Sequence, residues 1–258
     1  MKRSTVMSII GSVALFGGAL QAQGKPGLGL LPFTNSATGK AHDELAPLAK
    51  GLADMTIEEL LPNPSIRVVE RDQMNKIMDE QKLSSSGAVD PSTVVKLGKI
   101  VAAKYMLTGA YITMGNSLVL TMKAFSVETS EIVWTGSVTG KTDNILVLIN
   151  QLASKATKGL NLPPLAPVQE QAQQAKAERI KLPLQEALKF ARALDAKDAG
   201  KKDEAVALFN QVLDKFPEIV FGELVEHLDE AVALFNQVLD KFPEYDLAKK
   251  EKASIAGK

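Results

Sequence analysis

The sequence predicts an α/β fold, with a mixed sheet covered by helices and an all-helical repeat segment at the C-terminus. Residues 104–141 form the centre of this prediction, because apolar, β-favouring segments separated by two short turn signals are typical of a three-stranded antiparallel meander. The three strands are expected at 105–114, 118–127 and 131–139. Gly115-Asn116 predicts a two-residue hairpin between the first two strands. A short polar turn at 127–131 joins the last two.

The middle strand carries apolar residues on both of its faces. Val119, Phe125 and Val127 share one face, and Leu118, Leu120, Met122 and Ala124 share the other. A strand of this kind is typical of the interior of a sheet with helices on both sides. We therefore expect both faces of this strand to be covered.

The order of the remaining elements agrees with a mixed sheet between helices. Further strands are expected at 27–33 and 65–70, and helices at 45–61, 73–83, 92–103 and 144–160. In the first helix Lys50, Asp54 and Glu58 lie four residues apart, which indicates a solvated face. Glu59 and the pair Asp79-Glu80 are likewise expected on solvated helix faces.

The N-terminus has the layout of a secretory signal peptide over residues 1–22. Lys2-Arg3 is a cationic start, residues 7–20 form an uncharged apolar core, and Leu20-Gln21-Ala22 provides an end. The alternative is a retained membrane anchor. Since the chain has no cysteine, a bacterial lipid anchor is excluded. These features predict an exported, periplasmic protein of a two-membrane bacterium.

The rest of the chain divides into three predicted parts. Residues 24–162 form the α/β domain, and residues 163–183 form a Pro/Gln-rich linker and helix. The stretch 168–182 is either a helix for a partner or a solvated linker helix. Residues 184–258 form a helical region that resembles a tetratricopeptide repeat.

An exact internal repeat marks that helical region. The segment DEAVALFNQVLDKFPE occurs at 203–218 and again at 229–244. In the first copy Gly200, Ala205, Phe209, Val212 and Pro217 have the spacing of the second helix of a tetratricopeptide repeat, and 187–199 would be its first helix. The segment is either a hairpin packed on the main domain or a docking surface for proteins. In the second case the candidate partner-binding residues are Phe209, Phe216, Phe235 and Phe242.

Composition excludes several functional classes. The formal net charge is zero and no basic face is predicted, so nucleic acid is not an expected partner. Without cysteine there is no disulfide, thiolate catalyst or cysteine-held zinc. The two histidines, His42 and His227, lack nearby ligand-spaced residues, so no metal or other cofactor is expected. No catalytic residue is assigned.

Gly136 to Thr142 contains a Gly-Lys-Thr ending that is similar to a phosphate-binding loop. Such a loop needs four residues between its glycines, whereas only three separate Gly136 from Gly140. The interpretation we favour is a strand end followed by a turn, with Lys141 exposed. The alternative is a nucleotide-binding enzyme that uses Gly140-Lys141-Thr142.

Several segments together resemble the curli production assembly/transport (CsgG) family over residues 26–161. They are LLPFTN, GLADMTIEELL, IRVVERDQMNKIMDEQKL, AAKYMLTGAY and FSVETSEIVWTGSVTG. The more specific elements are Val69-Glu70-Arg71, Thr108-Gly109 and Ser130-Glu131-Ile132. The resemblance extends to periplasmic domains of TolB-like proteins and of activators of cell-wall synthases. It implies a role in the export of amyloid subunits through an outer-membrane ring.

Two departures from the family shape the expected function. The family's channel proteins are lipoproteins, whereas this chain has no cysteine to carry a lipid. The channel proteins also insert two long hairpins into the membrane, whereas this chain has only brief connections at 115–116 and after Gly140. We therefore expect a non-enzymatic periplasmic protein that binds other envelope proteins in outer-membrane assembly or secretion, as a homo-oligomer or in peripheral contact with the membrane. The alternative is a subunit of a curli-type secretion channel.

Overall fold

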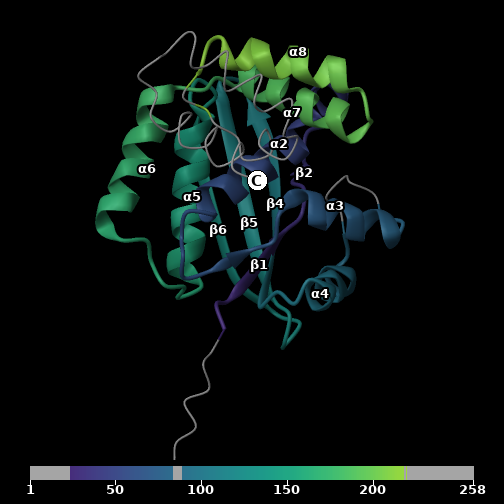
Figure 1. The fold of residues 1–258 in the computed structure, drawn as a ribbon, viewed down its shortest axis with the longest axis vertical. Helices are drawn as coiled ribbons and strands as arrows, with labels where there is room; N and C mark the ends of the chain where they lie inside the picture. Colours follow the sequence, from purple (N-terminus) through teal and green to yellow (C-terminus); the bar gives the residue numbers. More distant parts are fainter. Residues whose placement is uncertain (1–23, 84–88, 218, 220–258) are drawn as a thin grey trace, which may run out of the picture.

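The computed structural model describes residues 24–83, 89–217 and 219, and within them a six-stranded mixed sheet forms the centre of the molecule (Figure 1). The main path of the sheet runs β3-β1-β4-β5-β6, and β2 pairs with β4. β1 pairs in parallel with β3 and β4, whereas β4, β5 and β6 are antiparallel. The strands are β1 (Gly27–Leu30), β2 (Thr34–Asn35), β3 (Arg67–Val68), β4 (Tyr105–Met114), β5 (Ser117–Ser126) and β6 (Ile132–Lys141).

The predicted antiparallel meander is confirmed. Met114 pairs with Ser117 across a two-residue turn, in which Gly115 has a φ of +59°. A residue with a side chain rarely adopts that backbone conformation, which explains the glycine at this position. β6 then pairs along β5 with a register shift at Ala124/Phe125, close to the second turn.

Eight helices surround the sheet in the described part of the chain. They are α1 (Lys40–Leu45), α2 (Leu48–Leu60), α3 (Arg71–Glu80), α4 (Pro91–Ile100), α5 (Ile145–Gly159), α6 (Pro167–Ile180), α7 (Leu184–Asp198) and α8 (Lys202–Leu213). The predicted helix 45–61 corresponds to α2, and a short helix that was not predicted, α1, precedes it and is separated from it by Ala46-Pro47. Proline has no backbone N–H to donate to a preceding turn, so the helix begins again after it.

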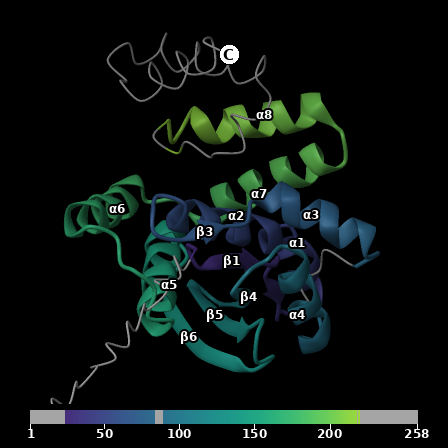
Figure 2. The same ribbon diagram turned by 60° about the horizontal axis from the view of Figure 1, so that its bottom comes forward.

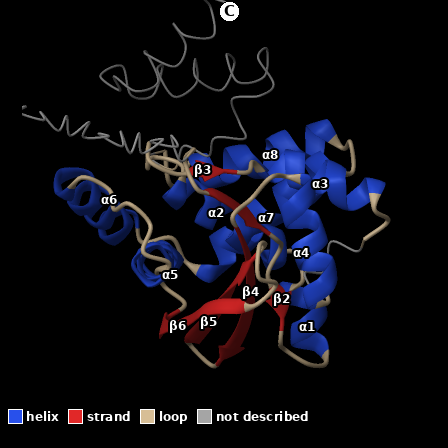
Figure 3. Ribbon diagram, turned by 90° about the horizontal axis from the view of Figure 1, so that it is seen from below, coloured by secondary structure: helices blue, strands red, loops and turns tan. Residues whose placement is uncertain are grey.

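The two faces of the sheet are covered unequally. α2 and α5 cover one face, where β5 buries Leu118, Leu120, Met122 and Ala124. On the other face α3 and α4 bury Phe125 and Val127 at one end only. Farther along β5, Val119 is half-buried and Lys123 is exposed, so the expectation that both faces of this strand are covered was wrong for this part. Figure 3 shows the sheet between α5 and α6 on one side and α1, α3 and α4 on the other.

The C-terminal helices stack on α2 rather than on the sheet itself. Figure 2 shows the order sheet, α2, α7 and α8 from one side of the molecule to the other. α7 approaches α2 closely at Gly51, where an added Cβ would lie 2.7 Å from the Cβ of Ala191. α8 packs on α7, with the ring centroids of Phe190 and Phe209 5.7 Å apart. The helical hairpin therefore extends the same core.

A cluster of charges joins α2, α3 and α7 at this junction. Arg71 is 5% exposed, and its guanidinium contacts Asp54, Asp72 and Asp198. Lys50 Nζ lies 2.8 Å from Asp195 and 2.9 Å from Asp198. The predicted solvated face at Lys50 and Asp54 was wrong, because α7 covers it and leaves Asp54 1% exposed.

Three sequence predictions concern residues outside the described ranges. They are the signal peptide at 1–22, the second repeat copy at 229–244, and the partner-binding roles of Phe235 and Phe242. Among the residues that are described, no helix is both long and apolar enough to cross a membrane.

Candidate functional site

A groove with a volume of about 330 Å³ lies between α5 and α6. It exists because α5 turns its apolar residues, including Leu148 and Leu152, toward the sheet and α2. The opposite side of α5 is mostly polar and faces α6. α6 buries only Ala177 and Ile180, so the two helices do not close on each other along their length.

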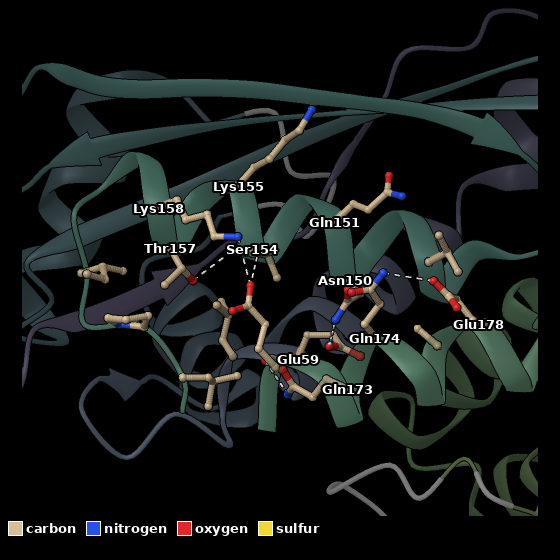
Figure 4. Close-up of a pocket in the computed structure, with 18 residues that line it drawn as sticks. Glu59, Asn150, Gln151, Ser154, Lys155, Thr157, Lys158, Gln173, Gln174 and Glu178 are labelled. Carbon is tan, nitrogen blue, oxygen red and sulfur yellow. Dashed lines mark hydrogen bonds and ion pairs between the residues drawn. The ribbon is translucent and has the colours of Figure 1, made fainter. Parts of the chain in front are cut away.

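The walls of the groove are rich in amide, hydroxyl and charged side chains (Figure 4). From α5 come Asn150, Gln151, Ser154, Lys155, Thr157 and Lys158, from α6 come Glu170, Gln173, Gln174 and Glu178, and from the end of α2 comes Glu59. The apolar part of the lining includes Leu60, Leu162, Pro164 and Leu165. The groove therefore combines hydrogen-bonding groups with apolar side chains in its lining, as ligand sites commonly do.

Glu59 is the most perturbed acid in the groove. Its Oε2 accepts a hydrogen bond of 2.9 Å from Asn150 Nδ2, and its backbone carbonyl accepts one of 3.1 Å from Gln173 Nε2. Burial raises the pKa of Glu59 above its ordinary value, and the Asn150 hydrogen bond and the charge of Lys176 only partly oppose this. Glu59 thus binds a proton more readily than an exposed glutamate.

A second set of polar contacts ties α6 to α5 near the start of α6. Glu170 accepts from Lys158 Nζ at 3.0 Å and from Ser154 Oγ at 3.4 Å. At the other end of α6, Asn144 Nδ2 donates to the carbonyl of Ala177 at 3.0 Å. The Gln/Ala-rich helix that could have been a solvated linker is therefore fastened to α5 by side-chain contacts at both ends.

The arrangement is suited to binding rather than to an identified reaction step. The hydrogen bonds of Glu59 are to the amides of Asn150 and Gln173 and not to the hydroxyls of Ser154 or Thr157, and the groove lining contains no histidine. Within the described ranges, no group of three or more His, Asp or Glu side chains could hold a metal ion. His42 lies on α1, where its Nδ1 is 3.2 Å from Asp43 Oδ1, and His227 is outside the described residues.

The Gly-Lys-Thr motif does not form a phosphate-binding loop. Gly140 and Lys141 are the last residues of β6 and pair with Leu118 and Ser117. Thr142 N donates to the carbonyl of Asn116 at 2.9 Å, and the carbonyl of Thr142 accepts from Leu184 N at 2.7 Å. Because this backbone already takes part in strand and turn hydrogen bonds, it does not offer converging N–H groups to a phosphate. The nucleotide-binding alternative gains no support from this segment.

The two described candidates for partner binding lie in the helical hairpin. Phe209 is 6% exposed and packs on Phe190, so its ring belongs to the core of the hairpin. Phe216 is half-buried and packs against the same cluster. For Phe209 this placement supports a packing role in place of a direct contact with a partner.

The groove itself was missed in the sequence. Glu59 was expected on a solvated face, and its partners come from positions far away in the chain. One available signal was Asn150, which with Gln151 interrupts the otherwise apolar segment 145–152. A polar side chain at such a position commonly has a hydrogen-bonding partner.

The fold and the helical hairpin define a protein with an α/β sheet domain followed by a tetratricopeptide-like segment. Residues 16–119 match the family model of the curli production assembly/transport component CsgG, and residues 186–218 match the tetratricopeptide repeat. Both resemblances predicted from the sequence are confirmed, and neither matching family is catalytic. The CsgG match ends at Val119, inside β5, so β6 and α5 lie beyond it.

Solved structures give weaker likenesses. The C-terminal domain of LpoB from Salmonella enterica is 20% identical, with 48% of this chain and 87% of that chain covered and a TM-score of 0.35. PelC from Paraburkholderia phytofirmans, described as a dodecamer, is 14% identical, with 55% and 92% covered and a TM-score of 0.35. No curated protein matches the sequence. Likenesses at this level say nothing about the activity or partners of this chain.

Proposed function

We propose that this chain is a non-enzymatic, exported protein of the cell envelope that acts in outer-membrane assembly or secretion by binding other envelope proteins. The observation that carries the proposal is the CsgG match over residues 16–119, joined to a tetratricopeptide match in the same chain. Tetratricopeptide-type repeats stack helices into surfaces, and repeat proteins use such surfaces for binding.

Short connections support a role without pore-forming hairpins of its own. β4 and β5 are joined by Gly115-Asn116 alone, and only residues 142–144 separate β6 from α5. In the alternative, a subunit of a curli-type channel, some other segment would have to cross the membrane. Conductance of the purified protein in planar bilayers separates the two: the proposal predicts none, and stable single-channel currents would contradict it.

Within this function, the groove between α5 and α6 is our candidate contact site for a partner. Its amide-bearing side chains Asn150, Gln151, Gln173 and Gln174 can donate to and accept from the backbone of an extended peptide segment. Its apolar lining residues can contact alternate side chains of that segment. We therefore propose a polypeptide as the ligand class.

Cell fractionation tests where the protein acts. The proposal predicts that the chain is recovered from the periplasm or released from membranes by salt, and that removal of residues 1–22 leaves it in the cytoplasm. Recovery of the intact chain only in a salt-resistant membrane fraction, or no effect of removing residues 1–22, would contradict it. A cytoplasmic protein of the same cells is the control for leakage.

A further inference from the structure

The surface of α7 that carries Glu186 and Phe190, which we call the α7 slot, is filled by a helix whose sequence occurs twice. That helix is α8, which lies within residues 203–218 apart from its first residue, and residues 229–244 repeat this segment without a single difference. Ala205, Phe209 and Val212 are buried in this packing. A surface that accepts the first copy must fit the side chains of the second copy equally well.

The residues of the first copy that contact α7 have identical counterparts in the sequence of the second copy. Phe209 packs on Phe190, and its counterpart is Phe235. Lys215 pairs with Glu186, and its counterpart is Lys241. The sequences diverge only beyond the copies, where the buried Ile219 corresponds to Tyr245.

The two copies differ in the length of chain that connects them to α7. α7 ends at Asp198, and residues 199–201 lead to α8, whereas residues 199–227 would lead to a helix that begins at the corresponding position before the second copy, Leu228. Since the closure of a flexible loop becomes less probable with about the 3/2 power of its length, the shorter link favours the first copy roughly 30-fold. Ile219 adds to this preference, because it is buried directly after the first copy.

We propose that residues 229–244 of the same chain are the second occupant of the α7 slot and dock there when the first copy is weakened or withdrawn. The hairpin then remains covered while residues 203–218 are released with their apolar face exposed. One copy covers the α7 slot, and the other copy is available to a protein partner. The duplication thus lets the tail bind without uncovering the core.

Amide hydrogen exchange of α7 in the purified full chain tests the exchange of copies. Phe209→Ala should lower the protection of α7 by no more than about 30-fold, because the second copy takes over. Phe209→Ala with Phe235→Ala should lower it by more than about 100-fold, as expected for loss of a buried phenylalanine with no substitute. Phe235→Ala alone should leave it within about twofold. If Phe209→Ala lowers the protection of α7 by the same factor in the presence and in the absence of Phe235, the proposal is wrong.

A cysteine pair gives a second test that does not depend on stability. The chain has no cysteine of its own, so Glu186→Cys with Lys241→Cys reports directly on docking of the second copy. The matched control is Glu186→Cys with Gln237→Cys, because Gln237 corresponds to Gln211 of the first copy, which is exposed. In the Phe209→Ala background the first pair should cross-link at least about tenfold faster than the control pair. Equal rates would overturn the proposal. A cross-link between two molecules would also overturn it, since it would place the second copy on another chain.

Discussion

Arg71, the first residue of α3, donates from Nη1 to both carboxylate oxygens of Asp198, the last residue of α7, at 3.1 and 3.0 Å. The two residues belong to the two segments that match different families. Lys50 and Lys197 extend the contact, because they pair with Asp198 and Asp72. This charge cluster fixes the helical hairpin to the α/β domain.

Removal of Arg71 should therefore destabilise the whole protein. Because the guanidinium is almost fully buried, Arg71→Met removes a buried cation from beside the carboxylates of Asp54 and Asp198, although Asp198 keeps its pair with Lys50. We expect a loss of about 3–5 kcal/mol in the free energy of unfolding, measured by urea denaturation. Lys40→Ala, which removes the exposed pair with Glu44, is the control and should cost less than about 1 kcal/mol. Equal effects of the two substitutions would refute the role of the cluster.

Gly51 and Ala191 should behave as a coupled pair. Gly51→Ala places its new Cβ 2.7 Å from Ala191 Cβ, so we expect a loss of roughly 1–3 kcal/mol from overpacking. Ala191→Gly in the same chain removes the opposing methyl group and should restore much of that loss. A double-mutant cycle of urea unfolding measures the coupling, and purely additive effects would show that α2 and α7 do not meet at this point.

Glu59→Gln should stabilise the protein at neutral pH and have little effect in acid. Burial raises the pKa of Glu59 in the folded state, so the folded wild type binds a proton at Glu59 more tightly than the unfolded chain does. The wild type therefore loses stability as the pH rises from about 4 through the folded-state pKa. Glutamine keeps an acceptor for Asn150 and carries no charge. The free energies of unfolding of variant and wild type at pH 7 and pH 3.5 test this. A variant less stable than wild type at pH 7 would contradict it.

Glu186 should show the opposite pH dependence. Burial opposes its charge, but hydrogen bonds from Lys215 and Lys189 outweigh burial and lower its pKa. A carboxyl group with a lowered pKa in the folded state stabilises the protein at pH values above its ordinary pKa of 4.5. This stabilisation is lost as the pH falls through the folded-state pKa. Glu186→Gln should thus cost less than about 1 kcal/mol at pH 7, and the difference should shrink below pH 4. A difference that grows in acid would refute this assignment.

Local patterns in the sequence predicted the sheet well. The β-favouring segments of 105–141 and the Gly115-Asn116 pair were enough to give the meander, because strand preference and turn type depend on neighbouring residues. The same reasoning failed where a distant segment covers a charged face. Lys50 looked solvated, since its partners Asp195 and Asp198 lie near the other end of the described chain.

The groove was unpredictable for the same reason. Asn150, Gln173 and Glu59 come from three helices, and nothing local to any of them indicates that they meet. The placement of Phe209 was open for the same reason, since the repeat pattern fits both a packed hairpin and a docking surface until the helix that Phe209 covers is known. Here that helix is α7 of the same chain.

In-cell photo-crosslinking from the groove tests the central claim, binding of an envelope protein, most directly. A photo-reactive amino acid at position 174, which lines the groove, is compared with one at position 171, which is exposed on α6 outside it. We predict a single adduct with another envelope protein from position 174, lost in the Gln173→Ala variant, and none from position 171. Equal adducts from both positions, or none from position 174, would contradict the account.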